Sequence, residues 1–150
     1  MRYDPAVIQP FRDELTAIGF RELRSAEAVD RSLAEDKGTN LLVINSVCGC
    51  AAGRARPGIA DALRRAAVRP DHLTTVFAGG DIEATQRVRE RIGNIPPSSP
   101  SFALFRNGEL VEFVPRYQIE KASAGQISDQ LLGIFEQHCR QVEAPARETK

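Results

Sequence analysis

The stretch 41–57 constrains the fold more than any other part of the chain. It begins with four consecutive aliphatic residues (41–44), which is typical of a strand buried on both faces of a sheet. Two cysteines separated by one glycine, Cys48 and Cys50, come next, and the alanine-rich residues after them favour a helix. The cysteines are therefore expected at the junction between a buried strand and the helix that follows it. In open α/β sheets this edge usually carries the ligand site.

This position favours a reactive thiol at Cys48. The N-terminus of a helix presents unpaired N–H groups and the positive end of the helix dipole, and both stabilise a thiolate over a thiol. Arg54 and Arg56 follow closely, and their charges are expected to lower the pKa of the thiol further. Guanidinium groups also bind carboxylates, so the two arginines are candidate docking groups for a carboxylate-bearing thiol. The alternative is that both are solvated charges on a helix surface.

The single residue between the cysteines has a consequence for redox chemistry. A disulfide between Cys48 and Cys50 would close a small ring away from the preferred disulfide geometry. Gly49 suits that ring because glycine tolerates unusual backbone conformations. A strained disulfide is more easily reduced, so the spacing predicts an oxidising or monothiol-like couple rather than a strong reductant.

Hydrophobic periodicity and turn residues predict the remaining elements. Helices are expected over 4–18, 25–36, 50–68, 81–92 and 123–138, strands over 41–47, 73–78, 102–105 and 110–114, and a short extended piece over 20–24. Pro57 is expected to bend the third helix or restart it at Gly58, and Asp81 to cap the fourth. Asn107 and Gly108 predict a tight antiparallel hairpin.

This order of elements predicts an α/β fold, a mixed sheet with helices on both faces and a C-terminal antiparallel hairpin. We expect one domain over residues 1–140, followed by a flexible C-terminal tail over 141–150.

Charge and composition exclude several classes of partner. Twenty basic residues balance twenty acidic ones, so no net field attracts nucleic acid or a membrane surface. Aromatic residues are few and tryptophan is absent, which argues against base stacking. No window reaches the roughly 18 apolar residues of a membrane span, and no apolar run follows the amino terminus as in a secretion signal. We therefore expect a cytoplasmic protein in which the close cysteine pair is catalytic or metal-binding.

Longer motifs resemble a known family. The thirteen residues 45–57, NSVCGCAAGRARP, are similar to the signature of the bacilliredoxins, which have a thioredoxin-like fold. The similarity extends over 3–139 and includes TVFAG at 75–79, Asp81 with EAT at 83–85, PPSSPS at 96–101, Arg116 with the Ile-Glu at 119–120, and Cys139. Family members commonly carry glutamine, histidine and glycine at the positions of Gly80, Tyr117 and Lys121, and these three residues depart from the pattern.

The resemblance implies an activity. Such a protein removes bacillithiol, or a similar low-molecular-weight thiol, from mixed disulfides on client proteins, and some members show weak disulfide isomerase activity. Cys48 would be the attacking thiolate, and Cys50 or a second bacillithiol would resolve the adduct. The partners implied are S-thiolated proteins. Bacillithiol is a co-substrate, and no cofactor is permanently bound.

The resemblance also implies a groove beside the cysteines. Pro100 would follow a cis peptide bond from Ser99 and pack against the cysteines. Ser99 and Pro100, together with Arg54 and Arg56, would then line the site for the client or the thiol.

Two other uses of the cysteines remain open. A thioredoxin-like scaffold could employ Cys48 and Cys50 as regulatory thiols or bury them as small apolar residues. Alternatively, the pair could hold zinc or copper(I), with Cys139 or a histidine, His72 or His138, completing the site. Cys139 by itself is expected to be a packed thiol at the end of a helix.

Overall fold

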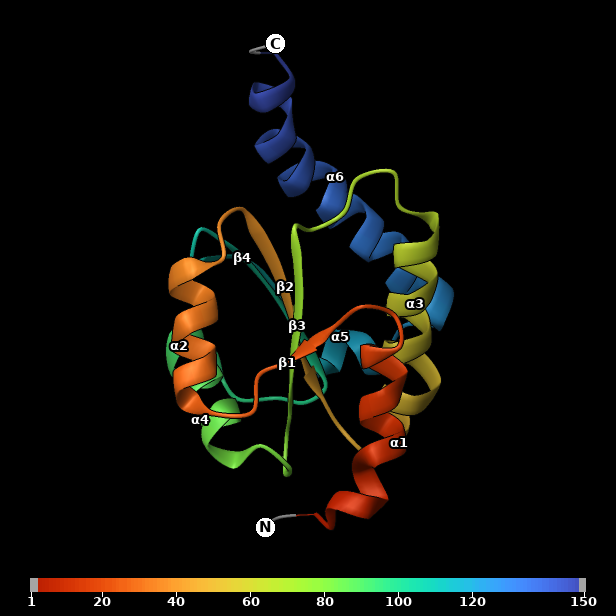
Figure 1. The fold of residues 1–150 in the computed structure, drawn as a ribbon. Helices are drawn as coiled ribbons and strands as arrows, with labels where there is room; N and C mark the ends of the chain where they lie inside the picture. Colours follow the sequence, from red (N-terminus) through yellow and green to blue (C-terminus); the bar gives the residue numbers. More distant parts are fainter. Residues whose placement is uncertain (1–2, 149–150) are drawn as a thin grey trace.

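A five-stranded mixed sheet forms the centre of the computed structural model, which describes residues 3–148, with side chains described as far as Cys139 (Figure 1). The strands are β1 (Arg21–Glu22), β2 (Thr39–Asn45), β3 (His72–Phe77), β4 (Ser101–Arg106) and β5 (Glu109–Val114). Their order across the sheet is β1-β3-β2-β4-β5. The first three run parallel, and β4 and β5 form the antiparallel part.

The central strand β2 is buried along its whole length. Its side chains alternate between two cores: Leu41 and Val43 belong to one, Leu42 and Ile44 to the other. This explains why the strand reads as a continuous aliphatic run, since both faces of the sheet are covered.

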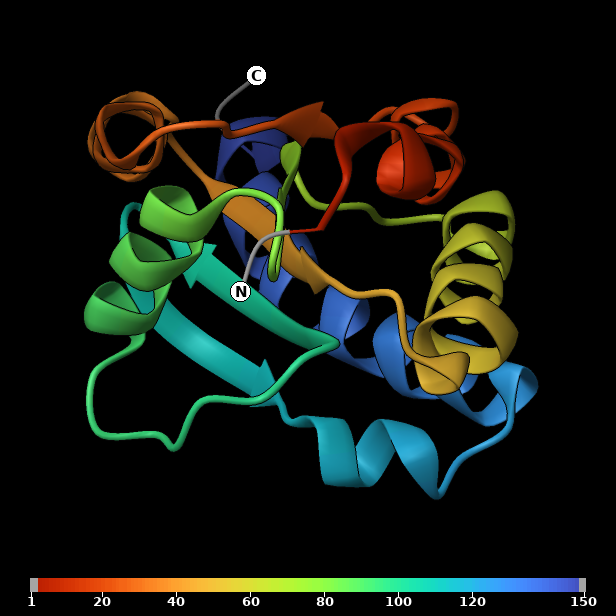
Figure 2. The same ribbon diagram turned by 90° about the horizontal axis from the view of Figure 1, so that it is seen from below.

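Helices cover both faces of the sheet (Figures 1 and 2). On one face lie α1 (Pro5–Thr16), α3 (Arg56–Arg65) and α6 (Ala124–Glu148). The other face is covered by α2 (Ala26–Glu35) and α4 (Ile82–Ile92). The predicted mixed α/β sheet with helices on both faces is confirmed. So is the hairpin, in which Asn107 and Gly108 have φ values of 50° and 86°.

The helix predicted over 50–68 is interrupted near Pro57, as predicted, but the predicted position of the restart is wrong, and the helix ends at Arg65 rather than at residue 68. A π-helical turn, η1 (Ala51–Ala55), comes first, and its wide geometry is seen in the bond from the Arg56 N–H to the Ala51 carbonyl. The α-helix α3 then starts at Arg56 rather than at Gly58. Pro57 thereby falls in the first turn of α3, where a missing N–H donor costs nothing.

Two further details differ from the predictions. The short helix α5 (Arg116–Glu120) has too few residues to show a period in the sequence. Helix α6 continues ten residues past its predicted end at residue 138. The predicted flexible tail over 141–150 lies outside the residues whose side chains are described, and its backbone is helical to Glu148.

Asp81 occupies the N-cap position of α4 but makes no side-chain cap bond. Its buried carboxylate instead accepts hydrogen bonds from Arg12 and Arg24, which compete with the cap.

Candidate active site

Cys48 lies at the amino end of the helical segment that follows β2. Its main-chain carbonyl accepts hydrogen bonds from the N–H groups of Ala51 (3.1 Å) and Ala52 (3.2 Å), as a residue that caps a helix does. Cys48 and Cys50 are half-buried free thiols. The structure therefore places both sulfurs at the carboxyl edge of the parallel strands, as the sequence predicts.

The loop that carries Cys48 is held by a chain of short-range hydrogen bonds. The Ser46 N–H donates to Asn45 Oδ1 (2.8 Å), and the Cys48 N–H donates to Ser46 Oγ (3.2 Å). The Ala78 N–H donates to the Asn45 carbonyl (3.0 Å), which ties the end of β2 to the end of β3. Asn45 and Ser46 thus order the loop rather than simply ending the strand.

The environment of Cys48 favours its thiolate. Partial burial raises the pKa of Cys48, but this is outweighed by the backbone N–H of Ala51, the Ser46 hydroxyl, the backbone N–H of Cys50 and the charge of Arg116. The pKa of Cys48 is therefore lower than that of an ordinary thiol. A half-exposed sulfur with this bias is suited to thiol–disulfide exchange.

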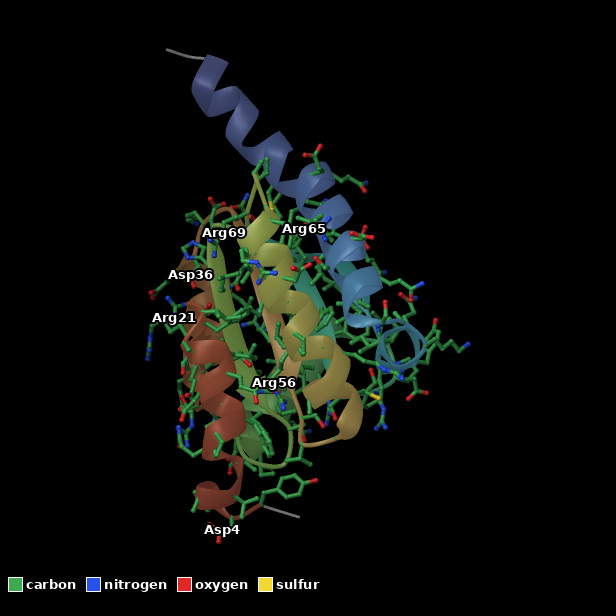
Figure 3. All side chains as sticks on the ribbon, turned by 90° about the vertical axis from the view of Figure 1, so that its right-hand side faces the viewer. Asp4, Arg21, Asp36, Arg56, Arg65 and Arg69 are labelled. Atoms are coloured by element: carbon green, nitrogen blue, oxygen red, sulfur yellow. The ribbon has the colours of Figure 1, made fainter. Side chains whose placement is uncertain are left out.

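Arg56 does not take the predicted docking role. Its side chain is buried between α1 and α3 (Figure 3), and the residue is only 3% exposed. It donates to Glu14 Oε1 (2.7 Å), Asn45 Oδ1 (3.0 Å) and the Ser46 carbonyl (2.9 Å). Arg56 is thus neither a solvated surface charge nor a group that a docked thiol can reach; it supports the cysteine loop from inside.

Arg54 is exposed, but its guanidinium donates to the main-chain carbonyl of Glu120, at the end of α5. The cation whose charge acts on Cys48 is Arg116, the first residue of α5. The pKa of Arg116 is raised in turn, chiefly by the charge of Cys48. The sequence predicts this effect for Arg54 and Arg56, because they lie near Cys48 along the chain. No local signal relates Arg116 to the thiols, and only its presence in the family pattern could have pointed to it.

The Ser99–Pro100 peptide bond is cis, as the family resemblance implies. Pro100 is buried, Ser99 is half-buried, and the next residue, Ser101, pairs with Ile44 of β2. Because β2 ends one residue after Ile44, the cis bond lies at the same sheet edge as the loop of Cys48.

A groove of about 740 Å³ lies between residues 95–98, the end of β5 and α5. Most of its lining is apolar, with Phe113 and Pro97 among the contributors, and Arg116 supplies a positive charge. The Arg116 N–H donates to Ser98 Oγ (3.2 Å), which connects α5 to the loop before the cis bond.

The proposed third ligands for a metal do not join the cysteine pair. His138 contacts Arg106 (3.1 Å), and Arg106 pairs with Thr39 at the opposite end of β2. His72 pairs with Asn40 at that same end. A seven-residue strand separates the two edges by roughly 20 Å, at about 3.3 Å per residue.

Cys139 does not join them either, since it is buried in the core between the sheet and α6. It is packed, as expected, but it lies within α6 rather than at its end. Among the described residues, no group of three or more His, Cys, Asp or Glu side chains is arranged to hold a metal ion.

Comparison with known proteins identifies the family. The model of a family described as disulphide isomerase matches residues 3–139. A bacilliredoxin of Salinibacter ruber is 51% identical over 148 residues, which cover 97% of this chain and 86% of that protein. A bacilliredoxin of Geobacillus kaustophilus is 47% identical over 137 residues, covering 91% and 94% respectively. The chain belongs to the bacilliredoxin family.

Solved structures agree on the fold of this bacilliredoxin. Thioredoxin from Fasciola hepatica superposes with a TM-score of 0.56 at 18% identity, covering 79% of this chain and 99% of that one. A mutant thioredoxin from Halobacterium salinarum gives a TM-score of 0.53 at 18% identity, covering 79% and 88%. The fold is thioredoxin-like, and the protein is a thiol–disulfide oxidoreductase. Within residues 3–148, every helix is too short or too polar to span a membrane.

Proposed function

We propose that this bacilliredoxin removes bacillithiol, or a similar low-molecular-weight thiol, from mixed disulfides on client proteins. The observation that carries the proposal is the position of Cys48, a half-exposed thiol of lowered pKa at the start of a helix. Its relatives named bacilliredoxin support the choice of thiol.

The first step is an exchange at sulfur. The Cys48 thiolate attacks the bacillithiol sulfur of the mixed disulfide, and the S–S bond to the client breaks. The client cysteine leaves as a thiolate and takes up a proton from water. Cys48 now carries the small thiol in a new mixed disulfide, so no net oxidation or reduction has occurred.

The second step frees Cys48. Either the Cys50 thiolate attacks Cys48, forming a Cys48–Cys50 disulfide and expelling bacillithiol, or a second bacillithiol attacks the bound one and leaves as the symmetrical disulfide. Cys50 is half-buried and two residues away, and Gly49 between them is exposed with open space beside it. The loop thus offers room for the intramolecular route, after which an external thiol must reduce the enzyme.

A second activity uses the same sulfur. The matched family is described as disulphide isomerase, which favours rearrangement of protein disulfides as a weak additional reaction. Here the Cys48 thiolate would attack a protein disulfide and be displaced by another client thiol. The proposed reactions start from reduced thiols, so we propose the cytoplasm as their compartment and S-thiolated proteins as the partners.

The test uses Cys50→Ala, which blocks intramolecular resolution. After incubation with a bacillithiolated protein, intact-mass spectrometry should find one bacillithiol on the Cys50→Ala variant and the client freed of it. The Cys48→Ala variant should accept none. A thiol at Cys48 that alkylates slowly, with an unshifted pKa, and accepts no adduct would overturn the proposal in favour of a regulatory scaffold.

A further inference from the structure

The cations on and beside α5 differ in how far their charges are already paired. Arg54 is held by the carbonyl of Glu120, and the Lys121 ammonium lies over the Tyr117 ring, 5.9 Å from its centroid. The Arg116 side chain is 45% exposed and has one carboxylate partner, Glu120, at 3.2 Å. That partner is itself 43% exposed, and such a pair is weak and easily exchanged for another carboxylate.

Arg116 is also the charged residue that joins the thiols to the groove. It lines the groove beside Pro97 and Phe113. Helix α5, which it begins, packs against η1, the turn that starts directly after Cys50. Neither sulfur lines the groove, but Arg116 does, and its charge also acts on Cys48. A ligand in the groove can therefore contact the guanidinium that lies near the thiols.

The size of the groove indicates what it holds. Small-molecule sites are typically clefts of roughly 300–1,000 Å³ with a mainly apolar lining and few charged groups. The groove, at about 740 Å³ with Arg116 and its partner Glu120 on an otherwise largely apolar wall, fits that description. A guanidinium on such a wall is suited to binding a carboxylate, for which its planar fork is the matching donor.

We propose that Arg116 and the adjoining groove bind the low-molecular-weight thiol during exchange, with the guanidinium pairing with a carboxylate of that thiol. The inference rests on the proposed function and assigns its co-substrate site. The ligand is the small thiol rather than an acidic client segment, because the first step leaves the small thiol covalently on Cys48, the residue on which the charge of Arg116 acts. The bound carboxylate replaces Glu120 as the partner of Arg116.

The test compares two small disulfides of similar length, 3,3′-dithiodipropionate, which carries carboxylates, and 2-hydroxyethyl disulfide, which is neutral. Their rates of reaction with Cys48 are measured in the Cys50→Ser background by intact-mass spectrometry. The quantity of interest is the ratio of the acidic to the neutral rate. Both reactions use the same thiolate, so a change in the pKa of Cys48 largely cancels in this ratio.

Arg116→Gln should lower the ratio about fivefold, the size expected for a half-exposed ion pair, and added salt should lower the wild-type ratio in the same direction. Lys121→Gln, which removes a nearby charge that does not line the groove, is the matched control and should leave the ratio within about twofold. An unchanged ratio in Arg116→Gln, or an equal loss in both variants, would overturn the proposal.

A second arm distinguishes the source of the carboxylate. Two peptides carry a cysteine blocked by neutral mercaptoethanol and differ only in an Asp or an Asn beside it. The ratio of the Asp-peptide rate to the Asn-peptide rate should be the same in wild type and in Arg116→Gln. A preference for the Asp peptide that Arg116→Gln abolishes, without an effect on dithiodipropionate, would assign Arg116 to clients and overturn the inference. If Cys48 exchanges with none of these disulfides, the proposed function itself fails, whereas exchange without a charge preference removes only the carboxylate site.

Discussion

The buried guanidinium of Arg56 donates a 2.9 Å hydrogen bond to the main-chain carbonyl of Ser46, whose hydroxyl in turn accepts the N–H of Cys48. The same guanidinium lies over the Phe11 ring, 4.9 Å from its centroid, and pairs with Glu14 of α1. A charge held inside the protein thus connects α1, α3 and the cysteine loop. Arg56 is almost inaccessible, and its hydrogen bonds to Asn45 and Ser46 hold the shape of the loop that carries the thiol.

Replacing Arg56 should therefore damage both stability and the thiol. Arg56→Met leaves the Ser46 carbonyl without the Arg56 donor and Asn45 Oδ1 with the Ser46 N–H alone, and we expect the free energy of unfolding to fall by about 2 kcal/mol. Arg56→Lys keeps the positive charge but not the planar set of guanidinium donors, and should lose less unfolding free energy than Arg56→Met. Denaturant unfolding measures the first effect, and the iodoacetamide alkylation rate of Cys48 measures the second. Arg64→Gln, at a 70% exposed side chain, is the control; equal stability of Arg56→Met and the control would contradict the prediction.

The lowered pKa of Cys48 predicts a definite pH dependence. Partial burial raises this pKa. The opposite effect is larger and comes from the N–H of Ala51, the Ser46 hydroxyl, the N–H of Cys50 and the charge of Arg116. The rate of Cys48 alkylation should therefore rise with a midpoint below the value of about 8.5 for an ordinary thiol. Ser46→Ala should move the midpoint upward, because one stabilising hydrogen bond is lost.

The same shift affects stability, and its sign follows from linkage. The folded protein holds Cys48 as a thiolate at a pH where the unfolded chain still holds a thiol. The stabilisation that the Cys48 thiolate gives the folded protein is present in full above the pKa of Cys48 in the unfolded chain. It is lost as the pH falls through the pKa of Cys48 in the folded protein. Relative to Cys48→Ser, the wild type should gain unfolding free energy as the pH rises through this window. A flat difference between the two proteins would contradict a lowered pKa.

The buried ion pair of Arg12 and Asp81 predicts a purely structural effect. Arg12 bonds both carboxylate oxygens of Asp81 at 2.8 and 3.0 Å, and Arg24 adds a third bond at 2.9 Å. Asp81→Asn removes the charge opposite a buried guanidinium and should cost about 3 kcal/mol of unfolding free energy. Glu83→Gln, exposed in the first turn of the same helix, is the control. The Cys48 alkylation rate of the folded Asp81→Asn protein should stay unchanged, and a large fall would give Asp81 a role in the site.

Two glycines near the site should respond in opposite directions to alanine. A Cβ on Gly58 of α3 would lie 2.6 Å from Ile127 Cγ2 and 3.0 Å from the Ala124 carbonyl of α6. Gly58→Ala should therefore force the helices apart and cost about 1–3 kcal/mol. Gly53, in η1, has open space around its Cβ position, and Gly53→Ala should stabilise by roughly 0.5–1 kcal/mol. Thermal unfolding of both variants checks the pair; a stabilising Gly58→Ala would show that the α3–α6 contact is looser than described.

Much of the fold is predictable from the sequence, because short stretches of neighbouring residues specify its strands and turns. A continuous aliphatic run marks the strand buried on both faces, and an Asn-Gly pair marks the hairpin. The position of Cys48 at a strand-to-helix junction is equally local, since it depends on a few adjacent residues.

The surroundings of the thiol depend instead on contacts between distant segments. Arg54 and Arg56 lie two residues apart in the sequence, yet one is exposed and the other is buried, because the π-helical turn and the packing of α1 on α3 set the direction of each side chain. Arg116 comes near the thiols only because β5 ends where α5 packs against η1. Residue types and their spacing determined where the cysteine pair lies in the fold. The charges that surround the sulfur of Cys48 follow from the tertiary packing, because electrostatic interaction depends on distance in space and not on separation along the chain.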